Sequence, residues 1–252
     1  MEGPSLFLAK EQLKPFKKKV VISATGNTKL DKAQFVGKQV RDIYSWGKHL
    51  IFQFDTFAIR VHFLLWGTFS AEVQGKSVTG DYEIKSRVPR LALTFSNGKV
   101  EMYNCSIKIL EDKNSKKSYD FSADIMSKKW DPEKALRKIK KDKEEEIGDV
   151  LLDQDIFAGV GNIIKNEVLF IVKIHPQQKI EDISLKKLKE IIMVAQSFSI
   201  QFYKWRKVFR LRANLKIYRK GSCPLCGTKI IREKTGKRQR WSFYCPFHQP
   251  LW

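Results

Sequence analysis

The sequence predicts an α+β protein of two domains, an N-terminal antiparallel β-sandwich followed by a C-terminal helical domain that ends in a hairpin. Short turn-bounded runs of β-branched and aromatic residues fill the chain up to residue 111, apolar residues have helical spacing after residue 131, and paired cysteines stand near the C-terminus. The expected boundaries are 1–111 for the β-domain, 112–130 for a linker, 131–218 for the helical domain and 219–252 for the hairpin.

The first domain is expected to begin with a short helix over 5–14, where the apolar residues have helical spacing. Six short segments then read as strands, separated by turn residues such as Gly26-Asn27 and Asn97-Gly98. Consecutive short strands favour an antiparallel sandwich or barrel. The expected strands are 20–22, 37–40, 50–54, 58–63, 91–95 and 99–103.

The second domain follows a polar, lysine-rich linker. Asp131-Pro132 is a good helix start, with Asp131 as the N-cap and proline in the first turn. Further helices are expected over 151–157, 162–170 and 184–202, where apolar residues recur with helical spacing.

The charge of the chain indicates an anionic partner. The 48 lysines and arginines against 27 acidic residues give a net charge of +21, which favours a phosphate backbone or an anionic membrane. No apolar run approaches the roughly 20 residues of a membrane span, and the N-terminus lacks the layout of a signal peptide. We therefore expect a monomer that binds nucleic acid, uses no membrane and is intracellular: in the nucleoid or cytoplasm if bacterial, in the nucleus if eukaryotic.

The C-terminal segment has the spacing of a metal site. Cys223-Pro-Leu-Cys226 and Cys245-Pro-Phe-His248 are two knuckles that together supply three thiolates and one imidazole, the ligand set of one tetrahedral Zn²⁺. The alternative is a turn that only stabilises the C-terminus. Between the knuckles one acid, Glu233, stands among many cations, which favours contact with a polyanion. These cations are Lys229, Arg232, Lys234, Lys237, Arg238 and Arg240.

A glycine-rich turn is expected between two helices of the second domain. Gly159 and Gly161 permit a tight turn, and Asn162 would open the next helix as its N-cap. Backbone N–H groups and the positive end of the helix dipole could then bind a phosphate. The alternative is a simple connection between helices.

Four motifs in the same order resemble the formamidopyrimidine-DNA glycosylase/endonuclease VIII family. Asp153-Gln154, the run 158–163, the run 166–170 and Ile174-His175-Pro176 are similar to its helix–two-turn–helix. The hairpin resembles its zinc finger, with a histidine in place of the usual fourth cysteine. Glu2-Gly3-Pro4 resembles its N-terminal signature, and the run 46–50, Trp-Gly-Lys-His-Leu, resembles its lysine-bearing strand turn.

The resemblance implies a bifunctional DNA glycosylase/AP lyase of base excision repair, with Met1, Glu2 and Lys48 as its catalytic residues. The family's nucleophile is normally the amine of an N-terminal proline, and Met1 occupies that place here. An α-amine is partly neutral near physiological pH, unlike a lysine amine, and could attack a deoxyribose to form a Schiff base. Glu2 would protonate the opening sugar, and Lys48 would assist proton transfer or bind phosphate. Without the proline, the chain could instead be a catalytically impaired binder of damaged or abasic DNA with the same fold.

The resemblance also implies which residues of this chain contact DNA. A wedge that fills the gap left by an extruded nucleotide would come from Leu64, Leu65 and Trp66, which would otherwise be core residues. Gly161, Asn162 and Arg240 would bind the phosphates of damaged, preferably double-stranded DNA. The 8-oxoguanine-specific branch of the family has an Asp-Pro-Arg-Arg-Phe-Gly-like run, and the run 103–108 of this chain differs from it. The difference resembles the endonuclease VIII branch and implies that oxidised pyrimidines are the preferred substrates. A second alternative is a zinc-ribbon protein that binds RNA or associates with the ribosome. This alternative would account for the basic C-terminal segment but not for the other motifs.

Overall fold

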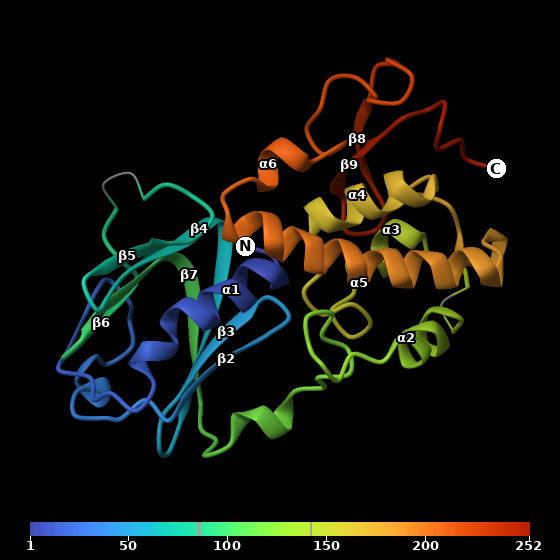
Figure 1. The fold of residues 1–252 in the computed structure, drawn as a ribbon. Helices are drawn as coiled ribbons and strands as arrows, with labels where there is room; N and C mark the ends of the chain where they lie inside the picture. The colour runs from blue at the N-terminus through green and yellow to red at the C-terminus, as the bar shows by residue number, and fades with distance from the viewer. Residues whose placement is uncertain (85–86, 142) are drawn as a thin grey trace. The chain divides into compact units, whose positions relative to one another are not determined.

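The protein, seen here in a computed structural model that describes residues 1–84, 87–141 and 143–252, consists of two compact units. The first is Met1–Tyr119 and the second is Asp120–Trp252, so the division falls inside the segment 112–130. Antiparallel strands fill the first unit and helices dominate the second (Figure 1). This confirms the predicted α+β order of the domains.

The first unit contains, among its described residues, a seven-stranded antiparallel sheet in the order β1-β6-β7-β4-β3-β2, with β5 paired to β4. The two longest strands, β4 and β7, pair along most of their length. The strands are β1 Ser23–Thr25, β2 Asp42–Trp46, β3 His49–Gln53, β4 Ala58–Val73, β5 Lys76–Thr79, β6 Leu91–Phe95 and β7 Gly98–Leu110.

The sheet has two halves because β3 pairs with the beginning of β4, whereas β5 pairs with its end. Phe52 and Val61 from the first half share one core cluster with Phe69 and Leu93 from the second. The halves therefore face each other as the two layers of the predicted sandwich, although they belong to one continuous sheet.

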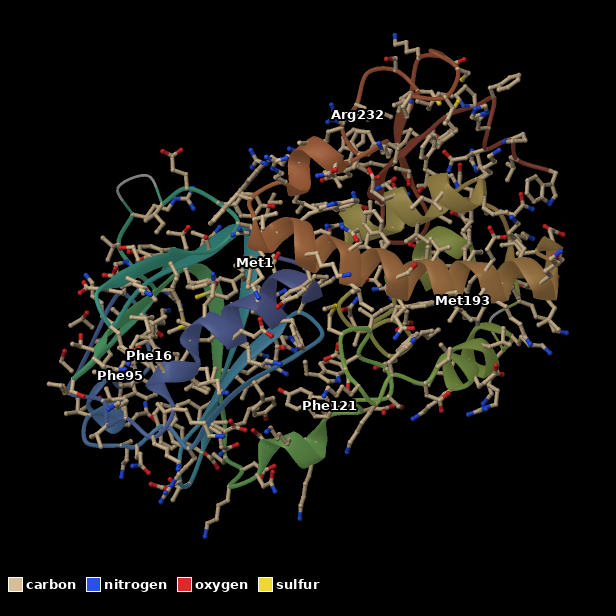
Figure 2. All side chains as sticks on the ribbon, in the orientation of Figure 1. Met1, Phe16, Phe95, Phe121, Met193 and Arg232 are labelled. Atoms are coloured by element: carbon tan, nitrogen blue, oxygen red, sulfur yellow. The ribbon has the colours of Figure 1, made fainter. Side chains whose placement is uncertain are left out.

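Helix α1, Gly3–Leu13, packs on β2 and β3. Leu6, Ala9 and Leu13 are fully buried, at the helical spacing that the sequence shows. Short 3₁₀ helices lie at Lys14–Phe16 (η1), Ala33–Phe35 (η2) and Ser115–Ser118 (η3). At η1, Phe16 stacks on Phe95 of β6 with 4.6 Å between ring centroids (Figure 2).

Two predicted strands were wrong. Segments 20–22 and 37–40 are joined by backbone hydrogen bonds, such as that from the Val21 N–H to the carbonyl of Lys38 at 3.0 Å, but they form an isolated bridge at Val20 and Gln39 and not strands. Gly37 has φ +77°, which turns the chain and prevents a longer ladder.

The second unit is built on helices α4 and α5, which pack against each other. Its helices are α2 Pro132–Ile139, α3 Ile147–Val150, α4 Asn162–Val172, η4 Ile180–Asp182, α5 Leu185–Lys207 and α6 Leu211–Asn214, followed by the hairpin β8 Ile231–Thr235 and β9 Arg240–Tyr244. Asp131 caps α2 by accepting the N–H of Lys134 at 2.9 Å, as the sequence predicts. In the described part of the chain, no helix is both long and apolar enough to cross a membrane.

The predicted helix over 151–157 was wrong. The chain makes one helical turn earlier, in α3, and then runs through turns in which Asp153 accepts the N–H of Asp155 at 2.8 Å. Such local bonds compete with a helix, while Leu151 and Phe157 are still buried. Asn162 is also not the N-cap of α4. Gly161 takes that position and Asn162 is the first helical residue.

Candidate functional site

The predicted site residues fall into two groups, one in each unit. Met1, Glu2, Lys48 and the candidate wedge lie in the first unit, and the candidate phosphate and zinc ligands lie in the second.

The N-terminus lies at the start of α1. Glu2 occupies the N-cap position, and its carbonyl oxygen accepts the N–H groups of Ser5 at 3.0 Å and Leu6 at 3.2 Å. The side chain of Met1 packs against the core of the β-domain and is partly buried. The helix thus fixes the backbone directly after the terminal amine.

Lys48 lies in the tight turn between β2 and β3, after Gly47, which has φ +52°. Its carbonyl oxygen lies 3.1 Å from Nδ1 of His62 on β4. Because a carbonyl only accepts, this contact makes Nδ1 the protonated nitrogen and leaves Nε2 as an acceptor when the ring is neutral.

His62 connects the turn to the N-terminus. Burial is the main cause that lowers the pKa of His62, and the positive charges of Lys48, the Met1 amine and Arg60 lower it further. Met1, Lys48 and His62 therefore share one electropositive neighbourhood within the first unit. No catalytic role was predicted for His62, because a single histidine before an apolar run carries little signal.

A second histidine extends this neighbourhood. The ring of His49 lies 5.3 Å from that of His62 and 5.9 Å from that of Trp46. Burial, followed by the charge of Arg60, lowers the pKa of His49 to about 4. The ring is therefore neutral at physiological pH.

The candidate wedge is a bulge in β4. Phe63 pairs with Cys105 and Thr68 with Tyr103, so residues 64–67 face a single residue of β7. The three candidate side chains are exposed, Leu64 by 45%, Leu65 by 70% and Trp66 by 43%, which excludes the alternative that they are core residues.

Several contacts fix the shape of the bulge. Asn104 Nδ2 donates to the carbonyl of Leu65 at 2.6 Å, and Arg87 Nη1 donates to that of Trp66 at 3.3 Å. A Cβ on Gly67 would lie under 3.0 Å from the backbone of Asn104 and Leu64, so only glycine fits there. Trp66 adopts φ +63° and meets Tyr82 edge-on at 5.2 Å.

In the second unit, β9 runs beside α4. The carbonyl oxygen of Trp241 accepts hydrogen bonds from Asn162 Nδ2 at 2.8 Å and from Asn166 Nδ2 at 3.3 Å, while Asn166 Oδ1 accepts the N–H of Phe243 at 2.7 Å. The two elements therefore run in the same direction, and Arg240, which is exposed, lies beside the first turn of α4.

Lys165, on the next turn of α4, reinforces this contact. It is 1% exposed, and its Nζ donates to Ser242 Oγ at 2.8 Å and to the carbonyl of Trp241 at 3.3 Å. A buried ammonium needs such partners, so this lysine ties the hairpin to the helix.

The four predicted metal ligands come together at the base of the hairpin. Ligand atoms of Cys223, Cys226 and His248 lie within 4.8 Å of one another, and the sulfurs of Cys226 and Cys245 are 3.6 Å apart. Two thiolates about 2.3 Å from a tetrahedral zinc ion would be about 3.8 Å apart, so the donors fit. Side-chain and backbone hydrogen bonding with Thr228 lowers the pKa of Cys226 to about 7.

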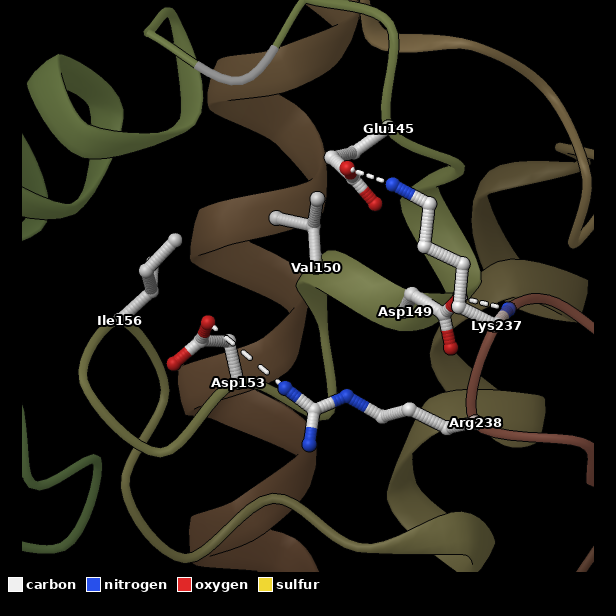
Figure 3. A pocket seen from close by; sticks show the side chains of 7 residues that line it. All are labelled: Glu145, Asp149, Val150, Asp153, Ile156, Lys237 and Arg238. Atoms are coloured by element: carbon white, nitrogen blue, oxygen red, sulfur yellow. Dashed lines mark hydrogen bonds and ion pairs between the residues drawn. The ribbon is translucent and has the colours of Figure 1, made fainter.

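The tip of the hairpin lies against acids of the same unit (Figure 3). Lys237 pairs with Glu145 and Arg238 with Asp153, beside a cavity of about 410 Å³ that Asp149 also lines. Two of the six cations that favour contact with a polyanion therefore pair with acids of their own unit, although the side chains of Lys237 and Arg238 remain exposed. The acids that bind them are distant in sequence, so the hairpin's own pattern could not reveal them.

Comparison with known proteins gives consistent matches. The family description "Formamidopyrimidine-DNA glycosylase H2TH domain" matches residues 121–199. Endonuclease 8-like 3 of Mus musculus is 30% identical over 219 residues, 85% of this chain and 35% of that protein. Endonuclease 8-like 2 of Bos taurus is 35% identical over 175 residues, 68% of this chain and 50% of that protein.

A solved structure matches the whole chain. Lactococcus lactis formamidopyrimidine-DNA glycosylase, bound non-covalently to DNA that contains an AP site, aligns with a TM-score of 0.82 and 20% identity, over 99% of this chain and 100% of that one. The fold is that of DNA glycosylases with a helix–two-turn–helix domain. The chain belongs to the formamidopyrimidine-DNA glycosylase/endonuclease VIII family, on its endonuclease VIII-like branch. It spans 35% and 50% of the length of the mouse and bovine relatives.

Proposed function

We propose that this chain is a bifunctional DNA glycosylase/AP lyase of base excision repair that removes oxidised bases, pyrimidines above all, from double-stranded DNA. The main support is the shared neighbourhood of the Met1 amine, Lys48 and His62, next to a bulge of exposed apolar side chains on the same strand as His62. A nucleophilic amine and a wedge are the two parts that such a reaction requires.

The amine of Met1 would act as the nucleophile. Its lone pair forms a bond to C1′ of the damaged nucleotide, while the electrons of the glycosidic bond leave with the base, which takes up a proton. Glu2 donates a proton to O4′ as the C1′–O4′ bond opens, and loss of the amine proton gives the C1′=N imine. The imine acidifies a C2′ proton. Its removal, with Lys48 nearby, expels the 3′-phosphate by β-elimination, and δ-elimination would release the 5′-phosphate.

The remaining site residues would hold and open the DNA. Leu65 and Trp66, with Leu64, would fill the vacancy that the extruded nucleotide leaves. Asn162, Gly161 and Arg240 would bind phosphates beside the lesion, the arginine through its bidentate fork.

Zinc would be structural. Cys223, Cys226, Cys245 and His248 would hold one ion, which cross-links the base of the hairpin and takes no part in bond chemistry. The hairpin then presents Arg240 on β9.

The test is borohydride trapping. Reduction in the presence of duplex DNA with an oxidised pyrimidine should give a covalent protein–DNA adduct whose linkage maps to Met1. A variant with one glycine added before Met1 should give far less adduct, although it binds the same DNA. Failure to trap an adduct with any oxidised or abasic strand would remove the lyase activity from the proposal.

One observation favours a second candidate, a binder of damaged or abasic DNA without catalysis. Methionine stands where the family has its proline nucleophile, so the reacting amine is primary. Tight binding to abasic DNA without base release or strand nicking would support this candidate.

A further inference from the structure

The turn of the hairpin is held by a carboxylate that the proposed chemistry does not use. Asp149 lies on α3 and is 8% exposed. Its Oδ2 accepts the backbone N–H of Lys237, with 2.5 Å between the heavy atoms. A hydrogen bond to a charged acceptor is stronger than one between neutral groups, so this contact fixes the backbone of the turn.

Gly236 leaves the space that this carboxylate occupies. It has φ +70°, and a Cβ there would lie well under 3.0 Å from the carboxylate of Asp149. An L side chain at this position would therefore be strained by the backbone conformation and would have to displace the acid.

The ion pairs of the charged side chains at the tip hold the turn less firmly than Asp149 does. The ion pairs Lys237–Glu145 and Arg238–Asp153 (3.8 Å) lie around the cavity (Figure 3), and the side chains of both cations are at least half exposed. Exposed pairs contribute little to stability, typically below about 1 kcal/mol. Asp149 is therefore the principal attachment of the turn.

Arg240 lies between this attachment and the contact of β9 with α4. On one side, residues 236 and 237 are fixed by Asp149, and on the other the carbonyl of Trp241 is fixed by Asn162. The backbone of Arg240 is thus held on both sides while its side chain is exposed. Bidentate binding of a phosphate depends on such alignment of the guanidinium.

We propose that Asp149 is a positioning residue that fixes the hairpin turn so that Arg240 meets a DNA phosphate, an inference that rests on the proposed function. Asp149 itself does not touch the DNA. It acts through the turn, and its loss releases the residues before Arg240.

The test is a double-mutant cycle on the zinc-loaded protein. Dissociation constants are measured at several salt concentrations for a duplex that carries a tetrahydrofuran abasic analogue, with Asp149→Ala, Arg240→Ala and the double variant. Each single change should weaken binding about tenfold and lower the slope of log K against log salt by about one phosphate contact. The double variant should bind within about twofold of Arg240→Ala, because both changes remove the same contact.

Further variants separate positioning from folding. Asp149→Asn keeps an oxygen that can accept the N–H of Lys237 and should restore most of the affinity and the salt slope. Gly236→Ala should reproduce the loss, whereas Gly75→Ala, with φ +74° and nothing within 4 Å, carries the same backbone cost and should bind normally. The zinc content should stay at one ion per chain throughout.

Two results would overturn the inference in distinguishable ways. Additive losses, about a hundredfold in the double variant, would refute the positioning role and leave the proposed phosphate contact of Arg240 intact. An Arg240→Ala variant with normal affinity and salt slope would refute that contact and the role of Asp149 with it.

Discussion

The side-chain amide of Asn162 donates a hydrogen bond to the carbonyl oxygen of Trp241, with 2.8 Å between the heavy atoms. The glycine-rich turn before α4 and the zinc hairpin were predicted as separate DNA-binding elements, and this bond joins them. Asn162 Oδ1 is buried and makes no hydrogen bond of its own. The residue is thus first a link between two elements, and any phosphate contact that it makes depends on the hairpin being in place.

Asn162→Ala is expected to weaken binding to damaged duplex DNA about fivefold to tenfold, because one hydrogen bond contributes about 1 kcal/mol and its loss leaves the carbonyl of Trp241 with only the longer bonds from Asn166 and Lys165. The affinity is measured by fluorescence anisotropy. Ser197→Ala is the control, since Ser197 is exposed on α5 and its hydroxyl donates to the carbonyl of Val194 in the same helix. Equal affinities for Asn162→Ala and wild type would contradict the link.

Leu65→Ala is expected to slow base release from duplex DNA by about tenfold and to leave release from single strands nearly unchanged. Leu65 is 70% exposed, so the fold does not need it, and a wedge is required only where a base pair must be opened. The ratio of the two rates is the measurement. Ile22→Ala removes a side chain of similar exposure, 57%, and should change neither rate. Parallel slowing on both substrates would argue against the wedge.

Local sequence patterns predicted the parts of the structure that local interactions determine. The capping of α2 by Asp131, the start of β6 at Leu91 and the four clustered ligands of the hairpin each depend on residues close in sequence or on a fixed spacing. The order of the two domains followed from the change in hydrophobic periodicity.

Contacts between distant residues could not be predicted. The bulge at 64–67 forms opposite Asn104, and the turn at Lys237 is held by Asp149 from another element. A single sequence contains no sign of either pairing. No site role was predicted for His62, because its electrostatic interaction with the Met1 amine and with Lys48 arises only in the fold.

Zinc binding is expected to depend on Cys226 and to tolerate His248→Cys. Cys226→Ser should lose most of the bound metal and weaken DNA binding, because one ligand is gone and the hairpin loosens. His248→Cys should keep one ion per chain, since four thiolates also bind zinc. Metal is measured by elemental analysis of the purified protein. Cys105→Ala is the control: Cys105 is buried in the β-domain core, and its loss should leave the metal content unchanged. Full zinc occupancy in Cys226→Ser would rule out this ligand set.

Glu2→Gln is expected to slow base release by about a hundredfold or more while binding to the same DNA changes less than threefold, because the amide cannot protonate the sugar. Single-turnover rates and dissociation constants separate the two effects. Glu72→Gln, at an exposed position on β4, should match wild type in both. A Glu2→Gln variant with normal single-turnover rates would exclude Glu2 as the acid.

The stability of the protein is expected to fall between pH 6.5 and about 4 through His49. Burial lowers the pKa of this histidine from 6.5 to about 4 in the folded state. Below pH 6.5 the unfolded chain therefore binds a proton that the folded chain does not. The contribution of His49 to the free energy of unfolding is thus complete above pH 6.5 and is lost as the pH falls. His49→Phe keeps a ring beside Trp46 and removes this proton, so its melting temperature should fall less between pH 7.5 and pH 5 than that of wild type. The charges that face His49, from Arg60, His62 and Lys48, are the same in both proteins, which makes the difference specific to His49. Melting curves that shift in parallel with pH would show that His49 takes up its proton equally in the folded and unfolded states.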